Sequence, residues 1–276
     1  MSGKLRISQD QVEYFDKLEE KLNITLTHGQ RKWYCYQQSI LGEKTKQEFP
    51  STVEESFLAS SDAYYFQQLV HDAYQDNRCL NYNIYDALES VYVAMDIGVN
   101  DLTVMTFFQV VHGEIRIIDY YADKDKGVEF YARFLLQDKN YLYNTIFLPH
   151  DAARRDNIVV ENTYERDFKK HFNHTSVRIK VLPRTDKNIN IQNTKLKFSR
   201  CVFNINKVKP LLDHVLKFRK KWSEQYGRYL DKEHEDINCD YADSLIYAMQ
   251  AVTHIEALGD VSGALKKHRR AVESRG

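Results

Sequence analysis

The stretch Val91-Tyr92-Val93-Ala94-Met95-Asp96-Ile97-Gly98 is where the sequence changes from helix-like to strand-like patterns. The residues before the aspartate are apolar, aromatic or β-branched, which is typical of a buried strand. Two more β-rich runs follow at residues 102–111 and 115–121, and Asn100-Asp101 and His112-Gly113 provide turn residues between the runs. We therefore predict an antiparallel three-stranded meander at the start of a sheet.

Patterns of helix and strand alternate after this meander. Apolar side chains recur at helical spacing in five later segments, at residues 127–138, 164–172, 191–198, 207–226 and 237–253. Short apolar or β-rich runs predict strands at residues 145–148 and 177–182, and an edge strand at residues 201–205. This order indicates an α/β fold, a mixed sheet flanked by helices.

The remainder of the chain divides into an extension and a tail. Residues 1–90 lack a strand-rich core and contain three pairs at capping-box spacing, Ser8 with Gln11, Thr27 with Gln30, and Thr52 with Glu55. We expect a helical N-terminal extension at residues 1–90, one main domain at residues 91–258, and a flexible basic tail at residues 259–276.

Composition excludes several classes of protein. The 276 residues are 43% hydrophobic, which is enough for a core, and no apolar run reaches the length of a membrane span. The four cysteines form no Cys-x-x-Cys pair, so we expect reduced thiols in an intracellular protein. Gly42-Glu43-Lys44-Thr45 lacks the earlier glycine of a phosphate-binding loop, and no Gly-x-Ser-x-Gly elbow of a serine hydrolase occurs.

The formal net charge of zero conceals an uneven distribution. Residues 1–90 hold 9 lysines and arginines against 14 acidic residues, whereas residues 168–232 hold 17 against 4. A basic block of this kind is typical of a protein that binds a polyanion, although a solvated face balanced by acidic neighbours gives the same pattern.

Three aspartates stand out by position: Asp96 closes the first strand, Asp151 follows the apolar run Ile146-Phe147-Leu148 after Pro149-His150, and Asp243 lies on the last predicted helix. Each has an ordinary alternative role, as a turn residue, a helix N-cap or a solvated helix edge. Together they could supply the oxygen ligands that a shared divalent cation requires. Asp101 follows Asp96 across the turn, and Asp240 precedes Asp243 by one helical turn, so both are further candidate ligands.

Several of these segments, in this order, resemble the C-terminal nuclease region of the large terminase subunit of tailed bacteriophages. The resemblance covers roughly residues 25–255. It includes Gln30-Arg31-Lys32-Trp33-Tyr34 and the segment Phe49-Pro50-Ser51-Thr52-Val53-Glu54-Glu55-Ser56-Phe57-Leu58, which resembles the connection to the packaging ATPase. It also includes three short motifs, Met95-Asp96-Ile97-Gly98, Leu148-Pro149-His150-Asp151-Ala152 and Tyr241-Ala242-Asp243-Ser244-Leu245-Ile246-Tyr247. The third motif departs from the family at Ser244, where alanine is common, and at Ile246, where arginine is common.

The resemblance implies a ribonuclease H-like fold and cleavage of concatemeric viral DNA by two Mg²⁺ or Mn²⁺ ions. Asp96 would bridge the ions, and Asp151 and Asp243 would each hold one, so that one ion activates water and the other stabilises the leaving oxygen. The implied partners are double-stranded DNA, a terminase ATPase domain, a small terminase subunit and a portal protein. The implied location is the host cytoplasm, transiently at the procapsid.

We expect DNA contacts to fall on phosphates and to give little sequence specificity, because no base-reading motif occurs. The candidate DNA-binding residues are Arg154, Arg155, Lys195, Lys197 and Arg200. Two other functions remain open. The fold could serve another nuclease such as a resolvase, or the domain could be a docking module for DNA or a portal that cuts weakly or not at all.

Overall fold

The computed structural model describes residues 7–42, 44–52, 63–98, 102–139, 141–153, 163–226 and 228–273. These residues form two compact units. The helical unit comprises Met1–Tyr65 and Arg219–Glu235, and the sheet unit comprises Phe66–Phe218 and Asp236–Gly276. The division therefore differs from the expected domain boundary at residue 90, because residues 66–90 belong to the sheet unit and a later segment belongs to the helical unit.

The helical unit is built from short helices and one hairpin. Its elements are α1 (Gln9–Leu22), α2 (His28–Leu41), α3 (Lys44–Glu48), β8 (Lys220–Ser223) and β9 (Arg228–Glu233). Ser8 and Gln11 form a capping box on α1, and Thr27 and Gln30 form one on α2, as predicted. The third predicted box includes Glu55, which lies outside the described residues.

The predicted helix over residues 207–226 is wrong in its second half. Helix α9 (Ile205–Val215) ends in a turn in which the Phe218 backbone N–H donates to the carbonyl of Val215. The chain then enters strand β8. The apolar spacing that favours a helix stops at Phe218, and the following Arg219-Lys220-Lys221 offers no apolar face to bury.

The sheet unit contains a seven-stranded mixed sheet in the order β1-β7-β4-β3-β2-β5-β6. Its strands are β1 (Cys79–Leu80), β2 (Val91–Asp96), β3 (Leu102–Val111), β4 (Glu114–Lys124), β5 (Tyr143–Leu148), β6 (Arg178–Val181) and β7 (Cys201–Asn204). Strands β2, β3 and β4 form the predicted antiparallel meander, with His112 and Gly113 at positive φ in the turn between β3 and β4. Strands β5 and β6 extend the sheet in parallel beyond β2.

Strand β7 is not the edge strand that we expected. It pairs in parallel with β4 on one side and with β1 on the other, so the two-residue strand β1 forms that edge. The register places Cys79 beside Phe203, more than a hundred residues later in the chain. Pairing over such a separation leaves no local pattern in the sequence, which explains why β1 was not predicted.

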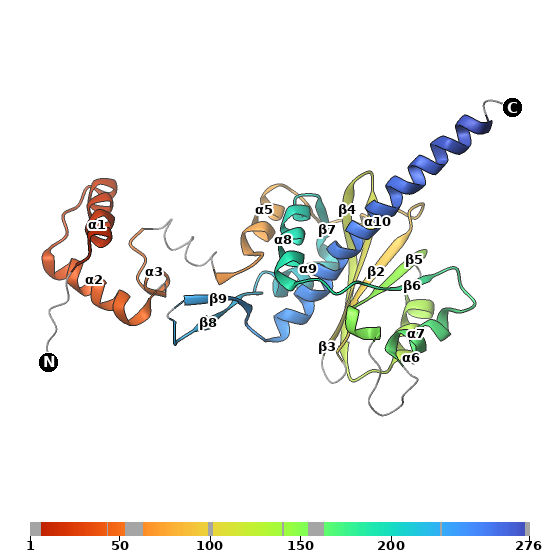
Figure 1. Cartoon of the computed structure of the whole chain (residues 1–276), viewed down its shortest axis with the longest axis horizontal. Helices are drawn as coiled ribbons and strands as arrows, with labels where there is room; N and C mark the ends of the chain where they lie inside the picture. Colours follow the sequence, from red (N-terminus) through yellow and green to blue (C-terminus); the bar gives the residue numbers. More distant parts are fainter. Residues whose placement is uncertain are drawn as a thin grey trace. The chain divides into compact units, whose positions relative to one another are not determined.

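Helices cover both faces of this sheet. They are α5 (Gln67–Gln75), α6 (Val128–Arg133) with the π-helical η1 (Phe134–Asp138), the 3-10 turn η2 (His150–Ala153), α7 (Tyr164–Phe172), α8 (Lys187–Phe198), α9 and α10 (Ile237–Glu273). Helices α6 and α7 cover one face (Figure 1), where Val91, Val93 and Met95 join a buried core with Tyr131 and Phe168. Helix α10 packs on β2 and β3 and is flanked by α8 and α9.

Helix α10 runs to Glu273, well beyond the predicted end before Gly259. A glycine inside a helix costs about 1 kcal/mol relative to alanine and does not by itself end the helix. The residues after Gly263 include Ala264, Leu265 and two lysines, which favour helix.

No helix among the described residues combines the length and the hydropathy that crossing a membrane requires.

Candidate metal centre

Asp96 and Asp151 lie at the same edge of the sheet. Asp96 is the last residue of β2, and β5, which ends at Leu148, runs parallel to β2 with Phe147 beside Ala94. After Pro149 the chain turns into η2, which carries Asp151. Because the carboxyl ends of two parallel neighbours meet at one edge, strand pairing alone brings these carboxylates into one region.

Ser244 attaches the third motif to the same region. It is fully buried on α10, its hydroxyl shares a 2.8 Å hydrogen bond with Thr106 Oγ1 of β3, and it donates to the carbonyl of Ala94 at 3.4 Å. Ala94 precedes Asp96 by two residues, so the side chains of Ala94 and Asp96 point to the same face of β2. The small side chain at position 244 lets α10 approach β2 closely, with Asp243 next to it.

Burial raises the pKa of Asp96 well above its ordinary value of 3.8. The negative charges of Asp243, Asp240 and Asp151 raise it further, and the positive charge of Lys187 lowers it. All four aspartates therefore lie in one electrostatic neighbourhood, although they come from three separate parts of the chain. Asp96 and Asp151 thus lie at one edge of the sheet, and Asp240 and Asp243 act electrostatically on Asp96, while their role as metal ligands stays a prediction.

Two other side chains of this neighbourhood were missed by the sequence reasoning. Burial raises the pKa of the Tyr247 hydroxyl, and the negative charges of Asp96, Asp243 and Asp151 raise it further. Lys187 Nζ lies 2.9 Å from Asp243 Oδ2. Asp186 could have indicated Lys187, because an aspartate before a polar and apolar run is a typical helix N-cap.

Asp186 caps α8 by accepting from the backbone N–H groups of Asn188 and Ile189 at 2.9 and 3.2 Å. The helix therefore begins at Lys187 and not at residue 191, where we expected it. This start makes Lys187 the first residue of α8 and directs the helix along α10, which α8 contacts.

The candidate DNA-binding residues are distributed differently. Arg154, Arg155 and the candidate ligand Asp101 lie outside the described residues. Arg200 Nε donates to the carbonyl of Gly113 at 2.7 Å, and Arg200 Nη2 forms an ion pair with Glu256 Oε1 at 2.5 Å. Gly113 follows the far end of β3 from Asp96, and Glu256 is about 20 Å along α10 from Asp243. Arg200 is therefore not part of the aspartate cluster.

Within the sheet unit, Lys195 and Lys197 lie toward the end of α8 that is nearest to Arg200 in the chain. Both belong to the last part of α8, about 12 to 15 Å along the helix from Lys187. The basic block is divided between the two units, because residues 168–218 belong to the sheet unit and residues 219–232 to the helical unit.

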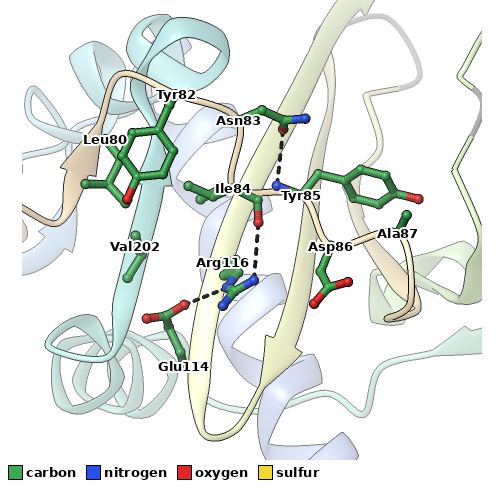
Figure 2. Close-up of a pocket in the computed structure, with 10 residues that line it drawn as sticks. All are labelled: Leu80, Tyr82, Asn83, Ile84, Tyr85, Asp86, Ala87, Glu114, Arg116 and Val202. Atoms are coloured by element: carbon green, nitrogen blue, oxygen red, sulfur yellow. Dashed lines mark hydrogen bonds and ion pairs between the residues drawn. The ribbon is translucent and has the colours of Figure 1, made fainter.

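An open pocket of about 440 Å³ also lies away from the aspartates. Figure 2 shows Arg116 of β4 in this pocket, between Glu114 and the carbonyl of Ile84. The Arg116 guanidinium donates to these groups at 2.6 and 3.4 Å. Arg116 pairs with Gln109 near the Gly113 turn, so the pocket lies toward the opposite end of the sheet from Asp96.

The donor set suits a hard divalent cation, because Mg²⁺ and Mn²⁺ prefer carboxylate oxygens. A cation among these carboxylates would also offset the repulsion that raises the pKa of Asp96. The side chains are not closed around one point, since no three His, Cys, Asp or Glu residues in the described part of the chain are arranged to hold a metal ion. One oxygen of Asp243 is instead in contact with Lys187.

The raised pKa of Asp96 predicts a pH-dependent stability. The Asp96 carboxyl holds its proton more tightly in the folded than in the unfolded state. The free energy of unfolding of the protein therefore falls as the pH rises from about 3.8 through the folded-state pKa of this carboxyl. Asp96→Asn removes the titrating group and with it this loss of stability. The loss is about 1.4 kcal/mol for each pH unit that separates the unfolded-state pKa from the folded-state pKa. We expect the variant to gain stability relative to wild type as the pH rises, in urea unfolding without metal. Parallel pH profiles for the two proteins would contradict this expectation.

Comparisons with known proteins identify the fold. No protein-family model matches the sequence, and no curated protein matches it significantly. The large terminase of a thermophilic bacteriophage matches 88% of this chain and 59% of its own, with a TM-score of 0.50 at 16% identity. The same large terminase in complex with ADP matches 67% of this chain and 45% of its own, with a TM-score of 0.50 at 14% identity.

The large terminase nuclease of a second thermophilic phage, G20c, with bound magnesium matches 68% of this chain and 96% of its own, with a TM-score of 0.46 at 14% identity. The chain thus spans about half the length of the first of these large terminases. The mixed sheet flanked by helices has the predicted ribonuclease H-like fold, and the resemblance to large terminases is confirmed at the level of the fold.

Proposed function

We propose that this chain is a metal-dependent endodeoxyribonuclease of a viral DNA-packaging terminase. The observation that carries the proposal is that Asp96 and Asp151 lie at one edge of a ribonuclease H-like sheet, and that Asp240 and Asp243 act electrostatically on Asp96. Four carboxylates, one of them with a strongly raised pKa, are costly to gather unless a cation offsets their repulsion. The fold shared with the large terminase that matches 88% of this chain supports the packaging context.

Asp96, Asp151 and Asp243 would hold two Mg²⁺ or Mn²⁺ ions, and Asp240 would assist Asp243. Ions held by these carboxylates would lower the pKa of an attacking water and would stabilise charge on the leaving oxygen. Ser244 fixes the distance between α10 and β2, and so holds Asp243 near Asp96. Burial and the charges of the same carboxylates raise the pKa of Tyr247.

Other lysines and arginines of residues 168–232 than Lys187, Arg200 and Lys209, which already contact carboxylates, would contact phosphates and hold duplex DNA without reading bases. The helical unit would connect the nuclease to a packaging ATPase, because the similar large terminase is about twice as long as the part that this chain matches. A small terminase subunit and a portal protein would be further partners, inside the host cell during packaging. These partners rest on the resemblance alone.

Incubation of the purified chain with supercoiled plasmid tests the proposal. We expect nicked and linear products with Mn²⁺ or Mg²⁺ and none with EDTA, because the carboxylates alone cannot activate water. Unrelated linear duplexes should give a continuous size distribution, because phosphate contacts carry no sequence information.

Two outcomes would favour the other functions. DNA binding without cutting under any divalent ion would favour a docking module, for which the contact of Lys187 with Asp243 is the supporting observation. A rate on four-way junctions far above that on linear duplex would favour a resolvase. One discrete fragment set from many unrelated duplexes would contradict the expected lack of specificity.

A further inference from the structure

Lys187 is a lysine held in place inside the aspartate cluster. Its ammonium lies 2.9 Å from Asp243 Oδ2, and its side chain is 34% exposed. The same ammonium lies 5.7 Å from the centroid of the Phe218 ring, and Phe218 is buried and stacks on Phe66. The cap by Asp186 fixes the start of α8 and therefore the backbone of Lys187. The contact with Asp243 fixes its ammonium.

The contact with Asp243 concerns the proposed ligands directly. An ammonium at hydrogen-bond distance uses a lone pair of the carboxylate oxygen that a metal ion would need. Its charge also acts on Asp96, where it opposes the three neighbouring carboxylates. Lys187 therefore neutralises part of the cluster without any metal.

We propose that Lys187 is the built-in counter-ion of Asp243, and that a divalent cation must displace its ammonium from this carboxylate in order to bind. This inference rests on the proposed function, because it presumes that Asp243 is a metal ligand. The displaced ammonium keeps its contact with the Phe218 ring, which attracts cations. Lys187 is thus a positioning residue that sets the affinity of the site and restrains cutting when free metal is scarce.

The inference predicts that a substitution at Lys187 strengthens metal binding. Replacing a residue that supports a metal site ordinarily weakens metal binding, often by 10 to 100-fold. Lys187→Met keeps the length of the side chain but removes both the competition for Asp243 and the repulsion between two cations. We therefore expect the dissociation constant for Mn²⁺ to fall by about tenfold, since a like charge within a few ångströms costs at least about 1.4 kcal/mol at a protein surface.

The experiment is a titration of the full chain with Mn²⁺, without DNA, in which electron paramagnetic resonance measures the free ion. Lys187→Arg retains a cation and should bind Mn²⁺ about as wild type does. Lys209→Met is the matched control, because it breaks the 2.7 Å pair with Asp213 on the surface of α9. We expect no change in its affinity. Circular dichroism checks that each variant is folded.

The outcomes separate the two hypotheses. Unchanged or weaker binding in folded Lys187→Met, with wild-type binding that depends on Asp96, overturns the counter-ion role and leaves the metal site intact. Absence of Mn²⁺ binding in both proteins overturns the counter-ion role and the proposed metal site together. Tighter binding in Lys187→Met alone, with Lys187→Arg and Lys209→Met unchanged, supports the inference.

Discussion

Asp96→Asn should abolish metal-dependent plasmid cleavage while DNA binding is retained. Asp96 is the carboxylate on which burial and the charges of Asp243, Asp240 and Asp151 all act. A metal site supplies several kcal/mol of transition-state stabilisation, and a loss of about 4 kcal/mol corresponds to about a 10³-fold lower rate. The substitution keeps the shape of the side chain, so the strand pairing of β2 should persist.

Single-turnover cleavage with Mn²⁺ measures this effect, and gel-shift binding at fixed salt measures DNA affinity. Asp213→Asn is the matched control, because it makes the same substitution in a surface ion pair on α9. Its cleavage rate should stay within about twofold of wild type, as expected for a surface pair worth at most about 1 kcal/mol. Cleavage by Asp96→Asn at the wild-type rate would reject the proposed nuclease.

Ser244→Leu should reduce cleavage by about 100-fold or more although no candidate ligand is changed. Ser244 is fully buried between α10 and the sheet, in contact with Thr106 and the carbonyl of Ala94. A larger side chain must move α10 away from β2, at a cost of about 1–3 kcal/mol in stability. A displacement of about 1 Å at a reacting centre can cost about 10²-fold in rate.

Ser244→Ala tests whether the site depends on the position of α10 or on the hydrogen bond of Ser244. It leaves Thr106 without the 2.8 Å partner, which costs about 1 kcal/mol, but it keeps the close approach of α10. Urea unfolding and cleavage at saturating Mn²⁺ should show reduced stability with a rate within about threefold of wild type. If Ser244→Leu does not fold, the smaller Ser244→Val provides the same comparison. Wild-type cleavage by folded Ser244→Leu would show that the spacing of α10 and β2 does not control the site.

The sequence shows where the candidate site residues lie on their elements, and the metal site itself stays a prediction. Asp96 and Asp151 end apolar runs that lie at neighbouring parallel strands, and strand ends are visible as changes in local pattern. Asp240 and Asp243 are a helical turn apart, so their shared face follows from helix geometry. Lys187 was missed because it lies 56 residues before Asp243 in the chain, on a different helix.

The errors have the same physical origin. The predicted helix over residues 207–226 extended a real apolar stripe past Phe218, where the chain leaves the sheet unit and enters β8 of the helical unit. Arg200 stays a prediction as a DNA contact, and its guanidinium is held by Gly113 and Glu256 at the far end of the sheet, which its charge alone did not indicate. Charge counts do not reveal which cations already have acceptors.

The sequence by itself therefore determined the meander, the aspartate at the end of β2, and the small residue beside Asp243, because period and composition are local properties. Only the tertiary structure decided that α10 lies against β2 and β3, that β7 is interior, and that an ammonium contacts Asp243. These features depend on contacts between distant segments, whose energy is gained only after the chain has closed the loops between them.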